Sequence, residues 1–174
     1  LGHPPLRSLL LRFVTRSELD RAIESGRLVR LGRGRIAPAG LDRGHAAAAG
    51  LSGMLCLASA ALDRRWSVAR TPPMPQVVVP RNRSVPASRR RGIDLRRWDA
   101  VGDGLVTGPE QTVLDCATHL PFLEAVCVAD SAVRSGDCTR LGLLRAAQAS
   151  ARSGRARRLA VVEAADGRAA NAVE

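Results

Sequence analysis

The chain has 174 residues and a formal net charge of +11 at pH 7, and all 27 of its basic residues are arginine. This length allows one or two small domains with a buried core. The sequence has no apolar run of about 18 residues and no charged-then-apolar leader, so it favours neither a membrane-spanning nor a secreted protein and predicts a cytoplasmic one. Aromatic residues are too few for stacking on single-stranded bases to be the main binding mode.

The positive charge has two interpretations. A phosphate-bearing partner would be held more tightly because each neutralised phosphate releases counterions. A GC-rich coding bias would also favour arginine, without any role in nucleic-acid binding. The charge is segregated, however: residues 81–98 hold seven arginines and one acid, residues 140–158 hold six arginines and no acid, and residues 99–139 hold seven acids and one arginine. Such segregation favours the phosphate interpretation, since bias alone does not predict it.

Residues 14–38 are the most informative stretch, and an apolar segment that resembles the end of a helix precedes them. Thr15 followed by Glu18 is a capping box, in which each side chain satisfies a free backbone N–H, so a helix is predicted to begin here. Its apolar residues recur at helical spacing, and Gly26 ends it because glycine accepts a left-handed conformation.

Two short strands are predicted next, over residues 28–31 and 35–37, joined by a glycine-permitted turn at residues 32–34. A helix followed by such a hairpin matches a winged helix-turn-helix, in which the helix enters the major groove and the wing lies on the backbone or minor groove. The same unit also occurs without any role in nucleic-acid binding, so this alternative stays open. The candidate DNA-binding residues are Thr15, Arg16, Ser17, Arg21, Arg30, Arg33 and Arg35.

The middle of the chain predicts a small sheet with one long helix before it. Residues 46–62 have a helical pattern rich in small residues, although it contains two glycines. The β-branched run at 76–79 predicts a strand, and residues 93–98 predict a second strand that pairs with it. Residues 81–92 predict an exposed basic loop, which is either a solvated turn or a contact for phosphates. A third short strand is expected at 105–106.

The last third of the chain predicts four helices. The first is expected to open with a capping box formed by Thr107 and Glu110, with Pro109 in its first turn. Thr139 is the expected N-cap of the third helix. The ranges expected for the helices are 109–118, 122–134, 140–150 and 155–165, and residues 169–174 are expected to form a poorly ordered tail.

No catalytic, metal or cofactor site is predicted. The cysteines are widely spaced and contain no C-x-x-C pair, so they are expected to be reduced, buried residues. The three histidines fall in separate segments without metal-ligand spacing and are expected in turns or on the surface. The carboxylates at 110, 115, 124 and 130 are expected to be ordinary helix or cap residues. Phosphate-binding glycine motifs and nucleophile elbows are absent from the sequence.

Three segments resemble the AbiEi-like antitoxins of type IV toxin-antitoxin systems: VTRSELDRAIESGRLVRLGRGRIAP, PQVVVPR and GLVTGPEQTVLDCATHLPFLEAVCVADSAVRSG. They equally resemble the actinobacterial proteins in which the same module precedes a very-short-patch-repair-like endonuclease domain. The resemblance implies an N-terminal winged helix that binds promoter DNA, followed by an α/β region with an antitoxin or regulatory role. A nucleotidyltransferase-like toxin would be a functional partner.

These observations lead to an α+β prediction with a winged helix-turn-helix domain over 1–40 and an α/β domain over 41–168. The leading hypothesis is a bacterial DNA-binding regulator or repressor that uses no cofactor, binds double-stranded DNA and pairs as a homodimer on two-fold sites. One alternative is the DNA-targeting part of a nuclease whose catalytic domain would follow residue 174. The other is a protein-interaction module with no DNA role.

Overall fold

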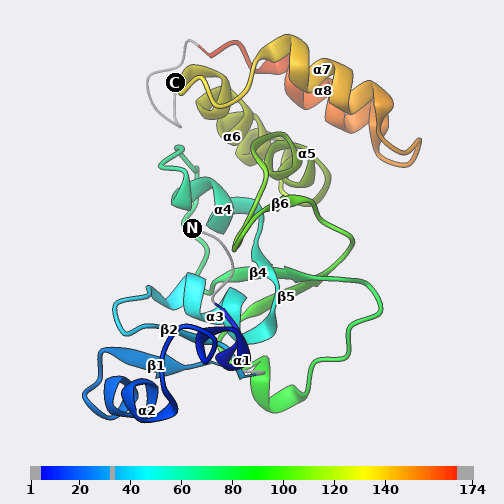
Figure 1. Ribbon diagram of the computed structural model, residues 1–174. Coiled ribbons are helices and arrows are strands. Elements are labelled where there is room, and N and C mark those ends of the chain that lie inside the picture. Colours follow the sequence, from blue (N-terminus) through cyan, green and yellow to red (C-terminus); the bar gives the residue numbers. More distant parts are fainter. Residues whose placement is uncertain (1–4, 32–33, 168–174) are drawn as a thin grey trace.

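The computed structural model describes residues 5–31 and 34–167 as an α+β fold. An N-terminal unit, a mixed sheet and a layer of helices follow one another along the molecule (Figure 1). The predicted domain boundary at residue 40 falls in the short connection between strand β2 and helix α3. The tail predicted after residue 168 lies outside the described residues.

The N-terminal unit, residues 5–31 and 34–40, contains helices α1 (Arg7–Leu10) and α2 (Arg16–Glu24) and strands β1 (Leu28–Arg30) and β2 (Ile36–Pro38). The predicted capping box at the start of α2 is confirmed, and Gly26 follows the helix with a φ of 72°. The predicted hairpin is also confirmed: β1 and β2 pair antiparallel, with Val29 opposite Ala37.

The sheet has five described strands in the order β5-β4-β3-β7-β6. Their bounds are β3 (Met54–Leu55), β4 (Gln76–Val79), β5 (Asp94–Arg97), β6 (Gly102–Asp103) and β7 (Val106–Thr107). The predicted pairing of β4 with β5 is confirmed, and it is parallel. Val77 and Val79 pack in the apolar cluster beside α3, whereas Val78 packs in the cluster on the opposite face. The β-branched run is therefore buried on both faces of the sheet.

The single helix predicted over 46–62 is wrong, because strand β3 interrupts it. Helix α3 (Arg43–Leu51) ends at Ser52, whose φ of 46° and ψ of 45° are left-handed, and helix α4 (Leu57–Asp63) begins after β3. Gly53 lets the chain pass directly against β4, because a Cβ atom there would lie 2.4 Å from the Val78 carbonyl oxygen. The glycine that weakens the helical pattern is thus required by the sheet.

The capping box predicted at Thr107 is also wrong. Thr107 belongs to strand β7, which therefore lies one residue later than predicted, and the N-cap of α5 is Gly108 without a side-chain cap. The Thr107 and Thr112 hydroxyl groups, both buried, lie 2.7 Å apart in a hydrogen bond instead. Pro109 lies in the first turn of α5, as predicted, and with Gly108 as the N-cap it occupies the first helical position.

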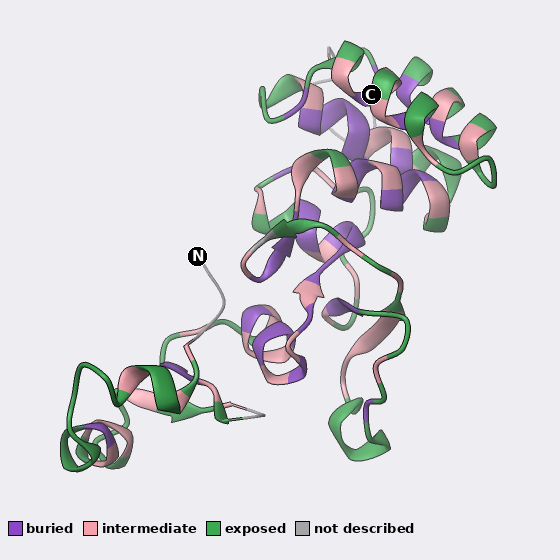
Figure 2. Ribbon diagram, turned by 45° about the vertical axis from the view of Figure 1, so that its right-hand side comes forward, coloured by how far each residue is buried: buried purple, intermediate pink, exposed green. Residues whose placement is uncertain are grey.

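Four helices form the layer farthest from the N-terminal unit (Figure 1). They are α5 (Pro109–His119), α6 (Phe122–Arg134), α7 (Arg140–Ala149) and α8 (Arg155–Ala164), close to the predicted ranges. The predicted N-cap of α7 is confirmed, since the Thr139 hydroxyl accepts a hydrogen bond from Gly142 N at 3.1 Å. The inner faces of these helices are buried (Figure 2). Three of the free cysteines are buried as predicted, and Cys127 is half-buried.

Two titratable residues, His45 and Asp115, are buried. His45 is buried, with Nε2 3.1 Å from the Asp63 carboxylate and Nδ1 bonded to Asp42. Asp115 is buried in the helical layer, where it accepts hydrogen bonds from Trp98 Nε1 at 3.0 Å and Gln111 Nε2 at 2.7 Å. Burial is the main reason why the pKa of Asp115 rises to about 6. The prediction of a turn or surface position for His45 is therefore wrong, whereas Asp115 is a helix residue, as predicted, and is buried.

Candidate nucleic-acid interface

Helix α2 lies on the outer side of the N-terminal unit, away from the rest of the protein (Figure 2). Leu19 is its one buried residue, and the predicted contact residues Arg16, Ser17 and Arg21 are all exposed. The later segments of the chain therefore leave this helix accessible to a large partner.

Thr15 fixes the beginning of α2. Its backbone N–H donates to the Glu18 carboxylate at 2.8 Å, and its hydroxyl accepts from Glu18 N at 3.3 Å. The hydroxyl group also donates to the same carboxylate at 2.7 Å. These hydrogen bonds are the main reason why the pKa of Glu18 is lowered. The Glu18 charge is thus used in holding the helix end at which a major-groove contact is expected.

Asp20 collects three arginines from different parts of the N-terminal unit. Arg7 on α1 and Arg30 on β1 each approach its carboxylate at 3.1 Å, and Arg16 lies 3.8 Å away. Arg16 and Arg30 remain largely exposed, with 78% and 63% of their side-chain surface accessible. Two of the predicted DNA-binding residues are therefore held together on one carboxylate, which fixes the hairpin to α2.

The two remaining candidates lie on the hairpin. Arg35 is half-buried, and its Nε donates to the Ser52 hydroxyl at 3.4 Å, so its side chain points toward the C-terminal end of α3 and not away from the protein. Arg33 lies outside the described residues, and its role stays a sequence-based prediction.

Two exposed arginines of the N-terminal unit escaped the sequence analysis. Arg12 lies four residues before the start of α2 and Arg27 three residues after its end, with Arg27 Nε donating to the Ser25 hydroxyl at 3.3 Å. Their positions just outside the two helix ends are the signal that could have found them. In its described part, the unit holds seven arginines and three acidic residues. Two of the acids already have partners: Glu18 is hydrogen-bonded to Thr15, and Asp20 is paired with arginines.

The basic loop predicted at 81–92 is exposed, as expected, over most of its length. It contains the single-turn 3₁₀ helix η2 (Ala87–Arg89). Arg83 Nη1 donates to the Ser52 carbonyl at 3.1 Å, and Arg90 Nε donates to the Val85 carbonyl at 2.8 Å. Arg89 and Arg91 are exposed, so their charges face solvent.

The second arginine cluster, residues 140–158, has a structural explanation that the charge count alone does not provide. Arg158 is buried and donates at 2.7 Å to the carbonyl groups of both Ala151 and Ser153. Arg157 donates to the Ala117 and Leu120 carbonyl groups at the end of α5. The side chains of Arg140 and Arg155 bind further carbonyl groups in the same way. Segregated charge here therefore serves the ends of helices.

The described residues support neither a metal site nor a membrane-spanning helix. Among the described residues, no group of three or more histidine, cysteine or acidic side chains could hold a metal ion. None of the helices in residues 5–31 and 34–167 combines the length and apolar character that crossing a membrane requires.

Comparison with known proteins relates the chain to a solved fold. No protein-family model matches it, and no curated protein matches it. Among solved structures, it is similar to the crystal structure of the RV2827C protein from Mycobacterium tuberculosis, with a TM-score of 0.52 and 21% sequence identity. The similarity covers 85% of this chain and 64% of the other, so the chain spans less than two thirds of that protein's length. At this identity the similarity shows a shared α+β fold.

Proposed function

We propose that the protein is a DNA-binding regulator whose N-terminal unit is a winged helix-turn-helix. Helix α2 would enter the major groove and the β1–β2 hairpin would act as the wing, as in other proteins of this architecture. The observation that carries the proposal is the exposure of Arg16 and Arg21 on a capped helix that the rest of the chain leaves uncovered. Arg30, held between helix and wing by Asp20, would contact a phosphate from the same side.

The particular regulator that the sequence favours is an antitoxin of the AbiEi-like kind. In that role the protein would repress its own promoter, and a nucleotidyltransferase-like toxin would be its functional partner. Because palindromic operators require two-fold symmetric proteins, a homodimer would bind the two half-sites. The sheet and the helices α5–α8 would form the scaffold that carries the DNA-binding unit.

The proposal is tested by titrating the full chain with a fluorescein-labelled 30-base-pair duplex from the upstream region of its own gene. Binding should be measured by anisotropy between about 50 and 200 mM salt, with an unrelated duplex as competitor. We expect Arg16→Ala/Arg21→Ala to make the log–log salt slope shallower by about 0.9 for each lost phosphate contact. Arg145→Ala/Arg152→Ala removes the same charge from an exposed site in the helical layer and is the matched control.

A failure to bind the upstream duplex at physiological salt would overturn the proposal. Equal slopes for the α2 variant and its control would remove α2 from the DNA-binding surface. Tight binding without preference over the competitor duplex would leave a DNA-binding protein but contradict its role as a regulator of that promoter.

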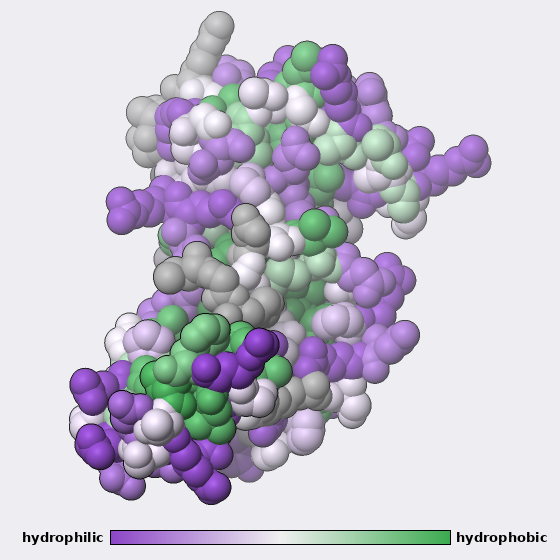
Figure 3. All heavy atoms as spheres, in the orientation of Figure 1, coloured by the Kyte–Doolittle hydropathy of each residue, from purple (hydrophilic) through white to green (hydrophobic). Residues whose placement is uncertain are grey.

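One observation favours a second candidate, a protein-interaction module. Several large apolar side chains of the N-terminal unit are exposed, and Phe13 is 80% accessible. Figure 3 shows them as a hydrophobic area around α1, in the lower part of the view. The large apolar residues of this unit that are exposed are Leu6, Leu9, Leu11, Phe13, Val14 and Val29. Apolar surface of this kind marks protein contacts more often than DNA contacts. Phe13→Ser would then weaken a protein complex and leave the salt slope of DNA binding unchanged.

A further inference from the structure

Ser52 connects two basic segments that are far apart in the sequence. Its hydroxyl accepts a hydrogen bond from Arg35 Nε of the hairpin at 3.4 Å, and its carbonyl accepts one from Arg83 Nη1 of the basic loop at 3.1 Å. Ser52 itself is held in the left-handed turn that ends α3. The hairpin and the beginning of the loop therefore both bind the turn that ends α3, which we call the Ser52 corner.

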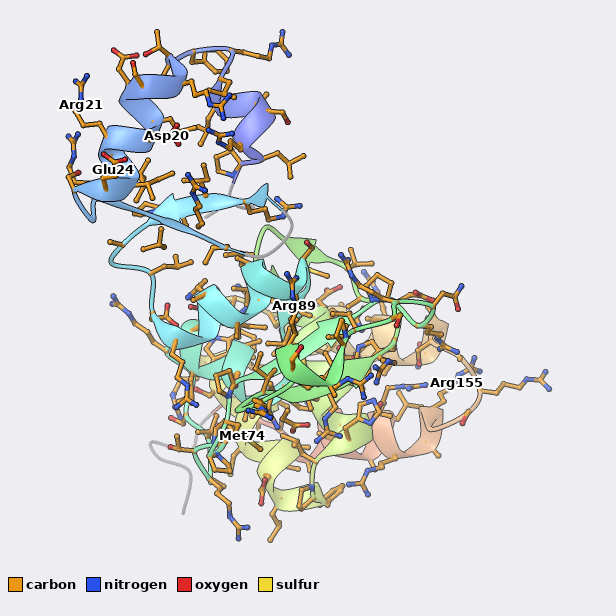
Figure 4. The ribbon with its side chains drawn as sticks, turned by 90° about the horizontal axis from the view of Figure 1, so that it is seen from below. Asp20, Arg21, Glu24, Met74, Arg89 and Arg155 are labelled. Atoms are coloured by element: carbon orange, nitrogen blue, oxygen red, sulfur yellow. The ribbon has the colours of Figure 1, made fainter. Side chains whose placement is uncertain are left out.

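From this corner the loop runs along α3 to the other end of that helix. Arg89 lines a groove of about 260 Å³ together with Ala46 and Gly50 of α3. At the end of the loop, Gly92 is covered by Arg43 from the first turn of α3, because a Cβ atom there would lie 2.9 Å from Arg43 Nη2. In Figure 4, Arg89 lies on the sheet-bearing part of the protein, on the side toward the N-terminal unit.

The loop is strongly basic along its own length, and its first arginine forms an exposed ion pair outside the loop, with Arg81 Nε 3.6 Å from Asp99 Oδ2. Residues 81–93 hold five arginines and no acid. Asp94, which follows them, is bound by Arg96 at 2.7 Å and by Gln76 at 3.3 Å. Arg89 and Arg91 are exposed, and the loop to which they belong is joined to the hairpin through Ser52.

We propose that this loop and the hairpin form one composite surface that contacts the phosphate backbone of a single DNA duplex. The inference rests on the proposed DNA-binding function and extends the contact surface from the N-terminal unit to the sheet-bearing part of the protein. Arg89 and Arg91 supply phosphate contacts beside those of the hairpin, and the Ser52 corner sets the spacing between the two groups. An arginine side chain suits this role because its guanidinium group binds phosphate oxygens in a bidentate manner.

The test uses the full chain and a fluorescein-labelled 30-base-pair duplex of arbitrary sequence, since backbone contacts do not depend on sequence. Three double variants are compared with wild type: Arg89→Ala/Arg91→Ala in the loop, Arg16→Ala/Arg30→Ala in the N-terminal unit, and Arg145→Ala/Arg152→Ala as the control of equal charge. We expect the loop variant to make the salt slope shallower by about 0.9 for each lost contact and the control to leave it unchanged. The combined loop and N-terminal variant should show the sum of the two changes, and wild type should bind no more than one duplex per chain in sedimentation.

The outcomes separate this inference from the proposed function. If wild type binds and the N-terminal variant changes the slope, but the loop variant behaves like the control, the composite surface is wrong and the proposed function stands. If wild type does not bind any duplex, both fail. Two duplexes per chain, or slope changes that do not add, would show separate binding surfaces and overturn the inference. Stronger binding of an anionic lipid vesicle than of the duplex, lost in the loop variant, would assign the loop to a membrane surface instead.

Discussion

Arg30 Nη2 on strand β1 lies 3.1 Å from Asp20 Oδ1 on helix α2, so the hairpin and the helix share a carboxylate that also binds Arg7 and Arg16. Asp20 thereby positions two candidate DNA-binding side chains and at the same time competes with phosphate for them. Because these ion pairs are substantially exposed, each stabilises the fold by only about 0.2–1 kcal/mol. The main consequence of this arrangement therefore concerns binding and not folding.

Replacing Asp20 by asparagine should release this competition. We expect Asp20→Asn to raise the affinity for duplex DNA and to make the salt slope steeper, because Arg16 and Arg30 become available to phosphate. Glu24→Gln changes the same charge one helical turn later and is the control (Figure 4). Anisotropy titrations of both variants would decide the matter, and equal slopes would show that the arginines around Asp20 do not contact DNA.

Arg158→Ala should destabilise the helical layer. The side chain is buried and donates hydrogen bonds to four acceptors, including the Ser150 and Thr118 hydroxyl groups at 3.0 and 3.2 Å. Because the substitution removes a buried side chain and all four of its hydrogen bonds, we expect a decrease of about 2 kcal/mol or more in the free energy of unfolding. Arg152→Ala, at an exposed neighbouring position, should stay within about 0.5 kcal/mol of wild type. Urea unfolding followed by circular dichroism measures both, and similar midpoints would contradict the structural role of Arg158.

Gly53→Ala tests the close approach of β3 to β4. The added methyl group would meet the Val78 carbonyl at 2.4 Å and the Val79 side chain at 2.9 Å, so backbone must move. We expect a loss of about 1–3 kcal/mol. Gly50→Ala places the same methyl group in α3 with no atom within 4 Å and should stabilise the protein by up to about 1 kcal/mol. Thermal unfolding of the two variants should therefore shift in opposite directions.

Asp115 should make the stability depend on pH in an unusual direction for a carboxylate. Its folded-state pKa of about 6 lies above the ordinary value of 3.8, so the folded protein binds this proton more tightly than the unfolded chain does. The resulting stabilisation is complete below about pH 4 and is lost as the pH rises to about 6, at most about 3 kcal/mol. Asp115→Asn keeps an acceptor for Trp98 and removes the titration.

The measurement is urea unfolding of wild type and Asp115→Asn at pH 4.5 and pH 7.5. Other carboxylates titrate equally in both proteins, so the difference between the two pH changes isolates Asp115. We expect wild type to lose more stability than the variant on going to the higher pH. An identical pH dependence would show that Asp115 is ionised in the folded protein at both values.

Local signals in the sequence predicted a large part of this fold. The capping box at Thr15, the N-cap at Thr139 and the first-turn Pro109 depend on neighbouring residues only, so each could be identified from spacing. The run at 76–79 is β-branched and bounded by prolines, and its pairing with residues 94–97 followed from alternation in the second strand. Helix ends and short strands of this kind require no knowledge of the rest of the chain.

The features that sequence analysis missed depend on distant partners. Gly53 interrupts a helical pattern because Val78, 25 residues later, lies against it. His45 is buried because Asp63, on another helix, faces its ring. The arginines at 140–158 have the composition of a phosphate site, but the carbonyl groups that they bind lie partly in α5. Among the described residues, the predicted contact residues of the N-terminal unit are exposed except Arg35, which Ser52 binds, and their role in DNA binding stays a prediction.

The arginines at the helix ends donate hydrogen bonds to neutral carbonyl oxygens, so these contacts do not offset their positive charge. A guanidinium group such as that of Arg158 is buried and cannot contact a partner directly. Its charge still contributes to the electrostatic field around the protein over roughly 8–10 Å, the screening length at 0.1–0.15 M salt. In the proposed DNA-binding role, such groups would steer an approaching duplex and raise its association rate without releasing counterions at a contact. The helical layer would then act at a distance, through electrostatic attraction alone.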